Sequence, residues 1–510
     1  MIPKFPLFLT LLVGGVFAWL WSTDHTFRAA SVMLLIPLWL LLLGLWWALH
    51  LRGVRLKRLG LFIVGVIAVV AAFRFFVRYE GSADGSAMPS LALRWQTQES
   101  RPAPFIPSGA AAATPSPTPP GVANMPRFLG AKGDGVLPEP DWQTDWKAHP
   151  PREVWRIQVG DGWSGFAVAG GRAITQEQRD AQEFVSCYDL ATGKLLWAHA
   201  DTARFDEAMG GIGPRATPTV DLAQNVVFTL GAKGLLNCLD LTSGKVRWSK
   251  EVLKDSGTTK SPQWGKSSAP LIVADNVVCS GGDDGASLIA YRSSDGQIAW
   301  KAGEDGGSYS SPVLMTLAGR EQIVTLNTNS VTGHDPASGA VLWRFDWQGA
   351  FPKVGQPVQV TPERIFITSS YGLKSHLLEI KADAGGKMTV ASIVSGSAPR
   401  TKFSSASVFG THAYAVDEGT FCCVDLTTGE RVWREGRYGF GQQIRVGDQW
   451  MIVQAEKGFV ALVKANPERL EEVSRLEALN TKTWNPPTLA GRWLLLRNDR
   501  EAVCFELPAK

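Results

Sequence analysis

Eight side chains that precede short strand-like segments are the candidates for ligand binding in this 510-residue chain. They are cationic, amide or aromatic: Arg215, Trp264, Lys266, Tyr309, Tyr371, Lys402, Gln442 and Trp484. Cations and hydrogen-bond donors suit carboxylate groups, so this set predicts that an anionic ligand binds there. The alternative interpretation is that these residues only end strands in water and cap their hydrogen bonds.

Metal-assisted oxidation of an alcohol or a sugar would require different residues. A divalent cation would have to be held by carboxylate and amide oxygens, and a carboxylate would have to take the proton of the substrate hydroxyl. Asp161 is the only acid near the eight positions, and it precedes a glycine in an expected turn. The sequence therefore predicts no catalytic residue and no metal ligand, and an anion can bind there without any reaction.

Other cofactor motifs are missing from the sequence. The run from Gly281 to Gly285 lies between two strand-like segments and predicts a hairpin turn rather than a cation site. The seven histidines are scattered, without the spacing of a zinc site. No Cys-x-x-Cys-His sequence is present, which excludes a c-type haem in this chain.

A nine-residue repeat determines where these candidates fall. It has the form Asp-x-x-Thr/Ser-Gly-x-x-x-Trp and occurs five times, once without its Asp. The repeat residues are Asp189, Gly193 and Trp197; Asp240, Gly244 and Trp248; Gly296 and Trp300; Asp335, Gly339 and Trp343; and Asp425, Gly429 and Trp433. The Asp can accept hydrogen bonds from backbone N–H groups two residues on, and the Gly supplies the positive φ of a hairpin turn. A Trp that recurs once per unit is expected to pack between neighbouring units.

Units of this length predict an all-β propeller with four-stranded blades. Two degenerate units, with Val390 and Val473 in the place of the Trp, fill the longer gaps. Residues 152–159 have the pattern of a last strand without a blade before it, and residues 502–507 that of a third strand without a fourth. Pairing of these two ends closes the ring and leaves no open edge. With the closing blade, the sequence predicts eight blades of about 45 residues.

Four of the six cysteines occupy one equivalent position of the repeat. Cys187, Cys238, Cys423 and Cys504 each lie two residues before the Asp or Glu of their unit. This places them on the third strand of four different blades, farther apart than the roughly 4.4–6.8 Å between the Cα atoms of a disulfide. We therefore expect small buried core residues with free thiols.

Three apolar stretches precede the repeats, at residues 5–21, 29–49 and 60–77. Each approaches or reaches the roughly 20 residues of a transmembrane helix. The loop before the third stretch carries Arg52, Arg55, Lys57 and Arg58, and short basic loops stay in the cytoplasm. With three transmembrane α-helices, the remainder of the chain lies on the other side. We expect a multi-pass protein of the inner (cytoplasmic) membrane, in contact with the lipid bilayer, with its propeller on the periplasmic or extracellular side.

The composition divides the chain into three parts. Residues 1–80 are the expected membrane anchor, residues 81–126 a linker rich in Pro, Ala and Ser, and residues 127–510 the propeller, with blades from about 152. The linker composition favours an extended polyproline II spacer. The formal net charge is only +4, and no basic cluster occurs outside the one loop, so nucleic-acid binding is not predicted.

With these repeats, the chain from about Arg127 to its end resembles the PQQ-binding-like β-propeller repeat proteins. The segments from Phe128 to Gly135 and from Tyr309 to Pro312 are also similar to segments of that family. It includes the outer-membrane assembly lipoprotein BamB and the quinoprotein dehydrogenases. The resemblance implies an eight-bladed, quinoprotein-like propeller. By resemblance alone, pyrroloquinoline quinone (PQQ) with Ca²⁺ is the candidate cofactor.

Two functions are compatible with this fold, because it hosts enzymes and non-enzymes alike. In the first, a non-catalytic propeller binds envelope proteins or a ligand at the mouth of its channel. The alternative is a membrane-bound, PQQ-dependent alcohol or sugar dehydrogenase. Membrane glucose dehydrogenases have five spans and longer loops, whereas this sequence has three apolar stretches and tight blades. We therefore favour the first function.

Overall fold

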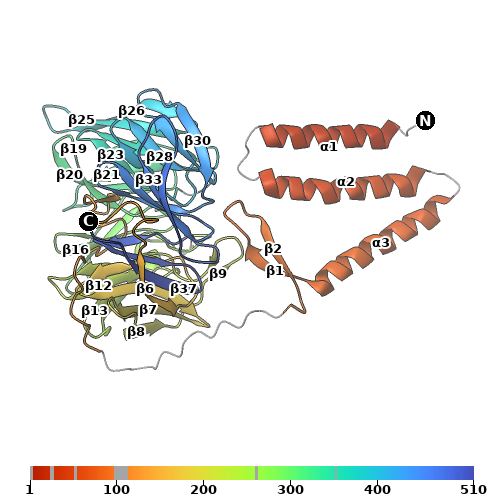
Figure 1. Ribbon diagram of the computed structural model, residues 1–510. Coiled ribbons are helices and arrows are strands. Elements are labelled where there is room, and N and C mark those ends of the chain that lie inside the picture. The colour runs from red at the N-terminus through yellow and green to blue at the C-terminus, as the bar shows by residue number, and fades with distance from the viewer. Residues whose placement is uncertain are drawn as a thin grey trace. The chain divides into compact units, whose positions relative to one another are not determined.

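The computed structural model describes residues 4–22, 28–50, 54–96, 113–258, 262–349, 351 and 353–510. The chain forms two compact units, Met1–Arg101 and Pro102–Lys510 (Figure 1). Each unit is described by itself below.

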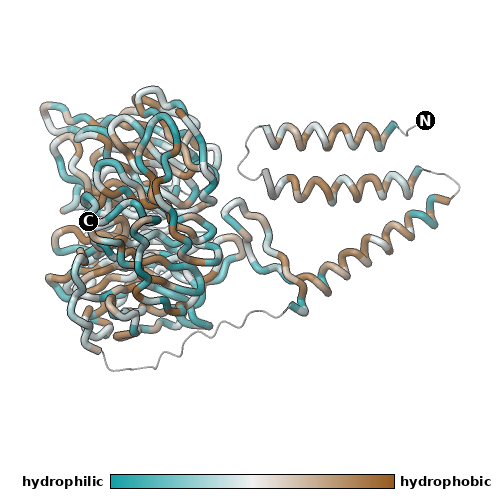
Figure 2. The backbone as a smooth tube through the Cα atoms, viewed as in Figure 1, coloured by the Kyte–Doolittle hydropathy of each residue, from teal (hydrophilic) through white to brown (hydrophobic). Residues whose placement is uncertain are grey.

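The first unit begins with three helices, α1 (Lys4–Ser22), α2 (Arg28–His50) and α3 (Arg55–Phe76). Most of their residues are hydrophobic (Figure 2). Two segments, Ser31–His50 and Arg55–Phe76, are long and apolar enough to cross a membrane. The expected first span is also helical, but its apolar part, Lys4–Leu20, is shorter than the other two. At 1.5 Å per residue it covers roughly 26 Å, less than the ~30 Å of a hydrocarbon core. The prediction of three spans is thus supported for two helices.

The expected linker contains structure at both of its ends. At the first end, β1 (Val77–Ser82) and β2 (Pro89–Leu93) form an antiparallel hairpin. Residues 97–112, which include part of the expected polyproline spacer, lie outside the described residues. From residue 113 the chain lies on the propeller, where the Ser116 N–H donates to the Asp189 carboxylate over 2.5 Å. Residues 113–151, which precede the first blade strand, are called the lead-in below.

The second unit is a ring of eight four-stranded antiparallel sheets (Figure 1). Blade one contains β5 Ala167–Ala169, β6 Arg172–Arg179, β7 Gln182–Asp189 and β8 Leu195–Asp201. Blade two contains β11 Thr219–Asp221, β12 Val226–Leu230, β13 Leu235–Asp240 and β14 Val246–Glu251. Blade three contains β15 Leu271–Val273, β16 Asn276–Ser280, β17 Leu288–Arg292 and β18 Ile298–Ala302. Blade four contains β19 Val313–Leu317, β20 Arg320–Leu326, β21 Ser330–His334 and β22 Val341–Asp346.

The second half of the ring repeats this order of strands. Blade five contains β23 Val358–Thr361, β24 Arg364–Ile367, β25 Ser375–Ala382 and β26 Met388–Gly396. Blade six contains β27 Ser407–Phe409, β28 His412–Asp417, β29 Thr420–Asp425 and β30 Arg431–Arg437. Blade seven contains β31 Gln442–Val446, β32 Trp450–Gln454, β33 Phe459–Lys464 and β34 Glu471–Glu477, with β3 Val136–Leu137 added beside β31. Smaller elements are β9 Asp206–Glu207, β10 Gly211–Ile212 and α4 Val252–Asp255.

Blade eight joins the two ends of the ring. It contains β35 Thr488–Ala490, β36 Trp493–Arg497 and β37 Glu501–Glu506, and its fourth strand is β4 Arg152–Gln158. Strand β37 pairs antiparallel with β4. The prediction of eight four-stranded blades, closed by the first strand, is therefore confirmed.

The repeat Trp of one blade lies against the turn of the next blade. Trp197 of blade one is 1% exposed, and its Nε1 donates to the Leu241 carbonyl of blade two over 3.0 Å. A Cβ atom at Gly244, in the same turn, would overlap the Trp197 ring. Trp155 and Trp248 make the same contact with the carbonyls of Leu190 and Ser293. These bulky rings fill the wedge between blades, and the glycines let them approach.

A small residue pairs with the Trp across each regular hairpin. The pairs that contain cysteine are Cys187 with Trp197, Cys238 with Trp248, Cys423 with Trp433, and Cys504 with Trp155. All six cysteines are buried and have free thiols. The predicted register of the four cysteines on third strands is confirmed.

The register of the two degenerate blades differs from the prediction. In blade five, Val394 rather than Val390 occupies the Trp position, since it pairs with Leu377 next to the bulge. In blade seven, Ser474 rather than Val473 occupies it, because it pairs with Leu462. Longer turns shift the alignment in both blades, and the sequence spacing alone does not reveal this shift.

The lead-in supplies a Trp where blade seven lacks one. The backbone N–H of Trp146 donates to Ser474 Oγ over 2.9 Å, and Ser474 Oγ donates to the Thr144 carbonyl over 2.6 Å. Trp146 is 3% exposed and belongs to the core cluster of blades seven and eight, together with Trp142. The lead-in is therefore part of the ring and not only a connection to it.

Candidate functional site

The innermost strands of all eight blades run in the same direction along the central channel. We call the end where they begin the upper mouth and the end where they finish the lower mouth. A cavity of about 130 Å³, the upper chamber, lies among the residues that precede these strands. Its aromatic lining residues are Phe128, Trp163, Trp264, Tyr309, Phe403 and Trp484. Arg215, Gln356, Gln442 and three serines supply most of its polar lining.

Five of the eight predicted ligand-binding residues line the upper chamber. They are Arg215, Trp264, Tyr309, Gln442 and Trp484. Trp264 and Tyr309 are neighbours, with ring centroids 5.7 Å apart, and the Tyr309 hydroxyl accepts from the Trp264 backbone N–H. The Gln442 amide donates to the carbonyls of Phe403 and Trp484. The structure thus brings these five residues from five blades or blade connections to one cavity.

The other three predicted residues do not line this chamber. Lys266 is buried, and its Nζ donates to Ser280 Oγ and to the carbonyls of Ser280 and Gly281, 2.6–3.0 Å away. Lys402 forms an ion pair with Glu418 at 3.2 Å. The Tyr371 ring lies 6.3 Å from that of Trp264 and 5.7 Å from Lys402 Nζ. Burial lowers the pKa of Lys266 to about 8.

Three aromatic residues of the chamber were absent from the predicted set. The Trp163 and Phe403 rings lie 4.8 and 5.0 Å from that of Trp484. Both precede an innermost strand at the same position as Arg215 and Trp484, so the repeat alignment contained this signal. Phe128 comes from the lead-in, and nothing in its sequence context indicates that it reaches the channel.

Arg215 is the positive charge of the upper chamber. Its guanidinium donates to the backbone carbonyls of Trp264, Gly211 and Gly213 and lies 4.7 Å from the Phe205 ring. Burial lowers the pKa of Arg215 to about 10, which leaves it cationic at neutral pH. Among the described residues no carboxylate forms an ion pair with it, and its Nε has no hydrogen-bond partner. The charges of Glu183 and Glu207 act on Arg215 without an ion pair, and a buried cation that no carboxylate contacts directly favours an anionic ligand.

Trp484 is held from two sides. Its Nε1 donates to the buried carboxylate of Glu456 over 2.6 Å. Lys482 Nζ lies 4.3 Å from its ring centroid and 5.3 Å from that of Trp163. Cation–π contact and the hydrogen bond fix the ring at the mouth.

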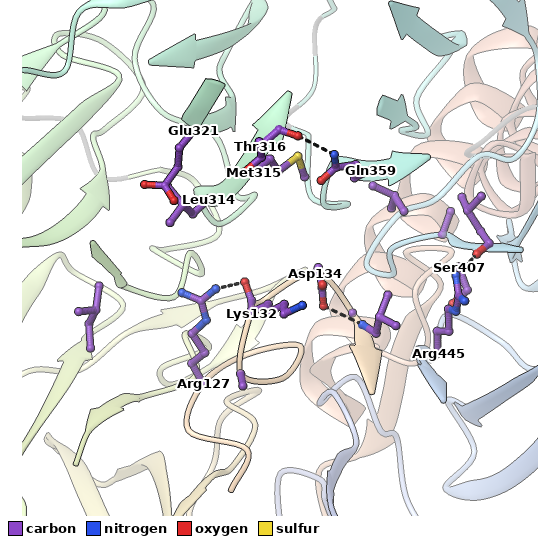
Figure 3. A pocket seen from close by; sticks show the side chains of 17 residues that line it. Arg127, Lys132, Asp134, Leu314, Met315, Thr316, Glu321, Gln359, Ser407 and Arg445 are labelled. Carbon is purple, nitrogen blue, oxygen red and sulfur yellow. Dashed lines mark hydrogen bonds between the residues drawn. The ribbon is translucent and has the colours of Figure 1, made fainter. Parts of the chain in front are cut away.

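A second cavity, the lower chamber, has a volume of about 560 Å³. One wall belongs to the lead-in and includes Arg127, Lys132 and Asp134, and the opposite wall includes Leu314, Thr316, Glu321 and Gln359 (Figure 3). Arg127 lines the lower chamber, whereas the next residue, Phe128, lines the upper one. The lead-in therefore passes through the channel between the two chambers.

The residues present do not fit PQQ together with Ca²⁺. No Asp or Glu lines the upper chamber, and the described residues contain no group of three His, Cys, Asp or Glu side chains that could hold a metal ion. The volume of about 130 Å³ is also well below the roughly 300–1,000 Å³ of small-molecule sites. Asp161 pairs with Gln178 at a bridge and does not line the chamber. In the lower chamber, Asp134 and Glu321 offset two of the three cations Arg127, Lys132 and Arg445, and this mixed lining disfavours a tricarboxylate.

Eight four-stranded blades, ring closure by β4 and a Trp wedge between blades define a quinoprotein-like β-propeller. The chain belongs to the PQQ_2 repeat family, described as outer membrane protein assembly factor BamB, whose model matches residues 181–435. No curated protein sequence matches the chain.

Solved structures show the same fold at low sequence identity. BamB from Moraxella catarrhalis is 16% identical with a TM-score of 0.51, and the match covers 70% of this chain and all of BamB. The quinohemoprotein alcohol dehydrogenase from Comamonas testosteroni is 11% identical with a TM-score of 0.57, over 76% of this chain and 81% of the enzyme. One neighbour is an assembly factor and the other an enzyme, so the fold does not distinguish the two functions.

Proposed function

We propose that the protein is a membrane-anchored propeller scaffold outside the cytoplasm that binds a partner segment or ligand at its upper mouth and catalyses no oxidation. The observation that carries the proposal is the composition of the upper chamber. It combines six aromatic residues with the buried cation Arg215 and has no carboxylate in its lining. This chemistry suits an apolar peptide segment that carries a carboxylate, and the small volume of the chamber favours the tip of such a segment over a drug-sized molecule.

The anchor in this proposal is formed by all three N-terminal helices. The short first helix can span if the bilayer thins locally around it. The basic loop with Arg52, Arg55, Lys57 and Arg58 keeps that side in the cytoplasm. The propeller then lies on the periplasmic or extracellular side of the inner membrane. A reporter enzyme that works only in the cytoplasm, fused after Lys510, should be silent, and an active fusion would refute this topology.

Binding at the upper mouth can be tested in the full-length protein in its membrane. A photo-crosslinking residue in place of Val354, in the chamber wall, should give discrete adducts with envelope proteins. The matched control is the same residue at Val341, which is 47% exposed on the outer strand β22. Adding Arg215→Gln should reduce the adducts from position 354 about tenfold, because a charge-assisted hydrogen bond is lost. Equal adducts from both positions, unaffected by Arg215→Gln, would refute the proposal.

The non-catalytic part of the proposal is tested by reconstitution. The full chain, incubated with PQQ and Ca²⁺, should show no dye-linked oxidation of primary alcohols or aldoses. The reason is the missing carboxylate set for the cation and for proton transfer. Turnover that Asp161→Asn abolishes would establish the alternative, a PQQ-dependent dehydrogenase.

A further inference from the structure

The lead-in fills one half of the lower channel. On that side it makes hydrogen bonds of 2.8 Å with three blades: Met125 with Val168 of blade one, the Pro126 carbonyl with Val220 of blade two, and the Gly121 carbonyl with Arg492 of blade eight. On blade seven, Val136–Leu137 pair in parallel with Arg445 and Val446. These contacts attach the lead-in to consecutive blades, from seven through eight and one to two.

The other half of the lower channel is the lower chamber. Blades three to six line it through Ile272, Thr316, Gln359 and Ser407, which belong to their innermost strands. Its apolar surface comes mainly from Ile272, Leu314, Met315 and Val358. Its volume of about 560 Å³ lies within the range of small-molecule sites.

Arg127 projects from the lead-in into this chamber (Figure 3). Its Nη2 donates to the Lys132 carbonyl, while its Nε is buried without a hydrogen-bond partner. No described carboxylate forms an ion pair with it, and Asp134 acts on it only at longer range. Burial lowers the pKa of Arg127 to about 10, so the guanidinium is still charged at neutral pH.

The loop around Arg127 holds it in this position. The Gly133 and Gly135 N–H groups donate to the carbonyls of Gly130 and Leu129, both over 3.0 Å. Gly133 has a φ of +72° and lies directly against the Arg127 guanidinium. A charged group held in a partly desolvated cavity costs free energy unless an anion pairs with it.

We propose that the lower chamber binds a small amphiphilic molecule through its single oxyanion, a carboxylate or a phosphate. Arg127 binds the oxyanion, and Lys132, which is exposed and makes no ion pair with a described residue, adds positive charge beside it. The apolar body of the ligand lies against Leu314, Met315 and Val358. Glu321 on the opposite wall disfavours ligands with several negative charges. This site is separate from the upper mouth, and it does not depend on the function proposed there.

The proposal is tested with the full chain in nanodiscs and three probes: phenylacetate, phenyl phosphate and the uncharged phenylacetamide. Ligand-observed NMR should show that both anions bind and that phenylacetamide binds at least about tenfold more weakly, since it cannot form the charge-assisted pair. The relative affinities of phenylacetate and phenyl phosphate identify the preferred oxyanion. Equal binding of all three probes would overturn the proposal.

Variants locate the site. Arg127→Gln should weaken anion binding in the lower chamber about tenfold, whereas Arg215→Gln, the matched change, should remove only the binding that comes from the upper chamber. Because Arg127→Gln can disturb the loop, Gln359→Glu serves as a second test from the opposite wall. Its added carboxylate should weaken the anions but not phenylacetamide. Loss of anion binding in Arg215→Gln, with both other variants unaffected, would place the probes in the upper chamber and overturn the proposal.

Discussion

The two chambers of the channel differ in how they are built. The upper chamber is formed by the segments that precede the innermost strands, so nearly all of its wall belongs to the repeats, with Phe128 as the addition. The lower chamber takes one wall from the innermost strands and the other from the lead-in, which contains no repeat unit. The upper lining is aromatic with one strong cation, whereas the lower lining carries charges of both signs. A change in the repeats can therefore alter either chamber, whereas a change in residues 131–136 of the lead-in alters only the lower one.

The largest loss of unfolding free energy is expected when the lead-in no longer packs on the ring. Trp146→Ala removes a side chain that is 3% exposed in the core of blades seven and eight, where Ser474 stands in the Trp position. Truncation of a buried Trp costs about 3–5 kcal/mol of unfolding free energy. We expect this loss in urea unfolding followed by circular dichroism, together with loss of anion binding in the lower chamber.

The matched control for Trp146→Ala is Trp95→Ala. Trp95 is 65% exposed and belongs to the other unit, so its removal should leave propeller stability unchanged. If Trp146→Ala costs less than about 1 kcal/mol, the lead-in is not part of the ring core.

The buried carboxyl group of Glu183 should make the unfolding free energy depend on pH. It is 6% exposed, and burial, strengthened by nearby Asp201, raises its pKa from 4.5 to about 7. The pKa of Glu183 is higher in the folded than in the unfolded protein. Its contribution to the unfolding free energy is therefore fully present below pH 4.5 and is lost as the pH rises through about 7. The whole change amounts to about 3 kcal/mol at 1.36 kcal/mol per pKa unit.

Glu183→Gln should abolish this dependence. The unfolding free energy of the wild type minus that of the variant should fall between pH 4.5 and pH 8 and then stay level. The ionised carboxylate also opposes the field of Arg215, which is among the charges that act on Glu183. Crosslinking from the upper mouth should therefore weaken above pH 7. If the difference in unfolding free energy between the wild type and Glu183→Gln does not change with pH, Glu183 does not titrate in this range.

Much of the ring could be predicted from the sequence because the same turn residues and the same Trp recur within short stretches of the chain. An Asp that starts a turn, a Gly that closes it and a Trp on the next strand are visible within nine residues. Lys266 and Lys402 were placed at the mouth because they precede innermost strands, but the residues after them, Ser267 and Phe403, line the chamber instead. Successive side chains point in opposite directions in extended chain, so a shift of one residue exchanges buried and lining positions.

The path of the lead-in could not be predicted in the same way. Residues 127–135 have no hydrophobic period, and four of their nine positions, counting both ends, are Gly or Asp. Their position depends on hydrogen bonds to blades more than 40 residues away in sequence, such as that between Pro126 and Val220. Arg127 therefore has no local signal that marks it as a channel residue, although its neighbour Phe128 belongs to the segment that indicated the family.

The smallest effect is expected from Gly133→Ala, which changes the lower chamber without removing any of its groups. A Cβ at this position would lie 2.6 Å from Arg127 Nη2, and the φ of +72° disfavours any residue with a side chain. Gly257→Ala is the matched control, because its φ is +88° and no heavy atom lies within 4 Å of its added Cβ. Both variants should lose about 1–2 kcal/mol of stability from the left-handed backbone. Only Gly133→Ala moves the guanidinium, so only this variant should weaken phenylacetate binding, by about threefold, or about 0.6 kcal/mol. Equal binding by the two variants would mean that the position of Arg127 does not control the lower chamber.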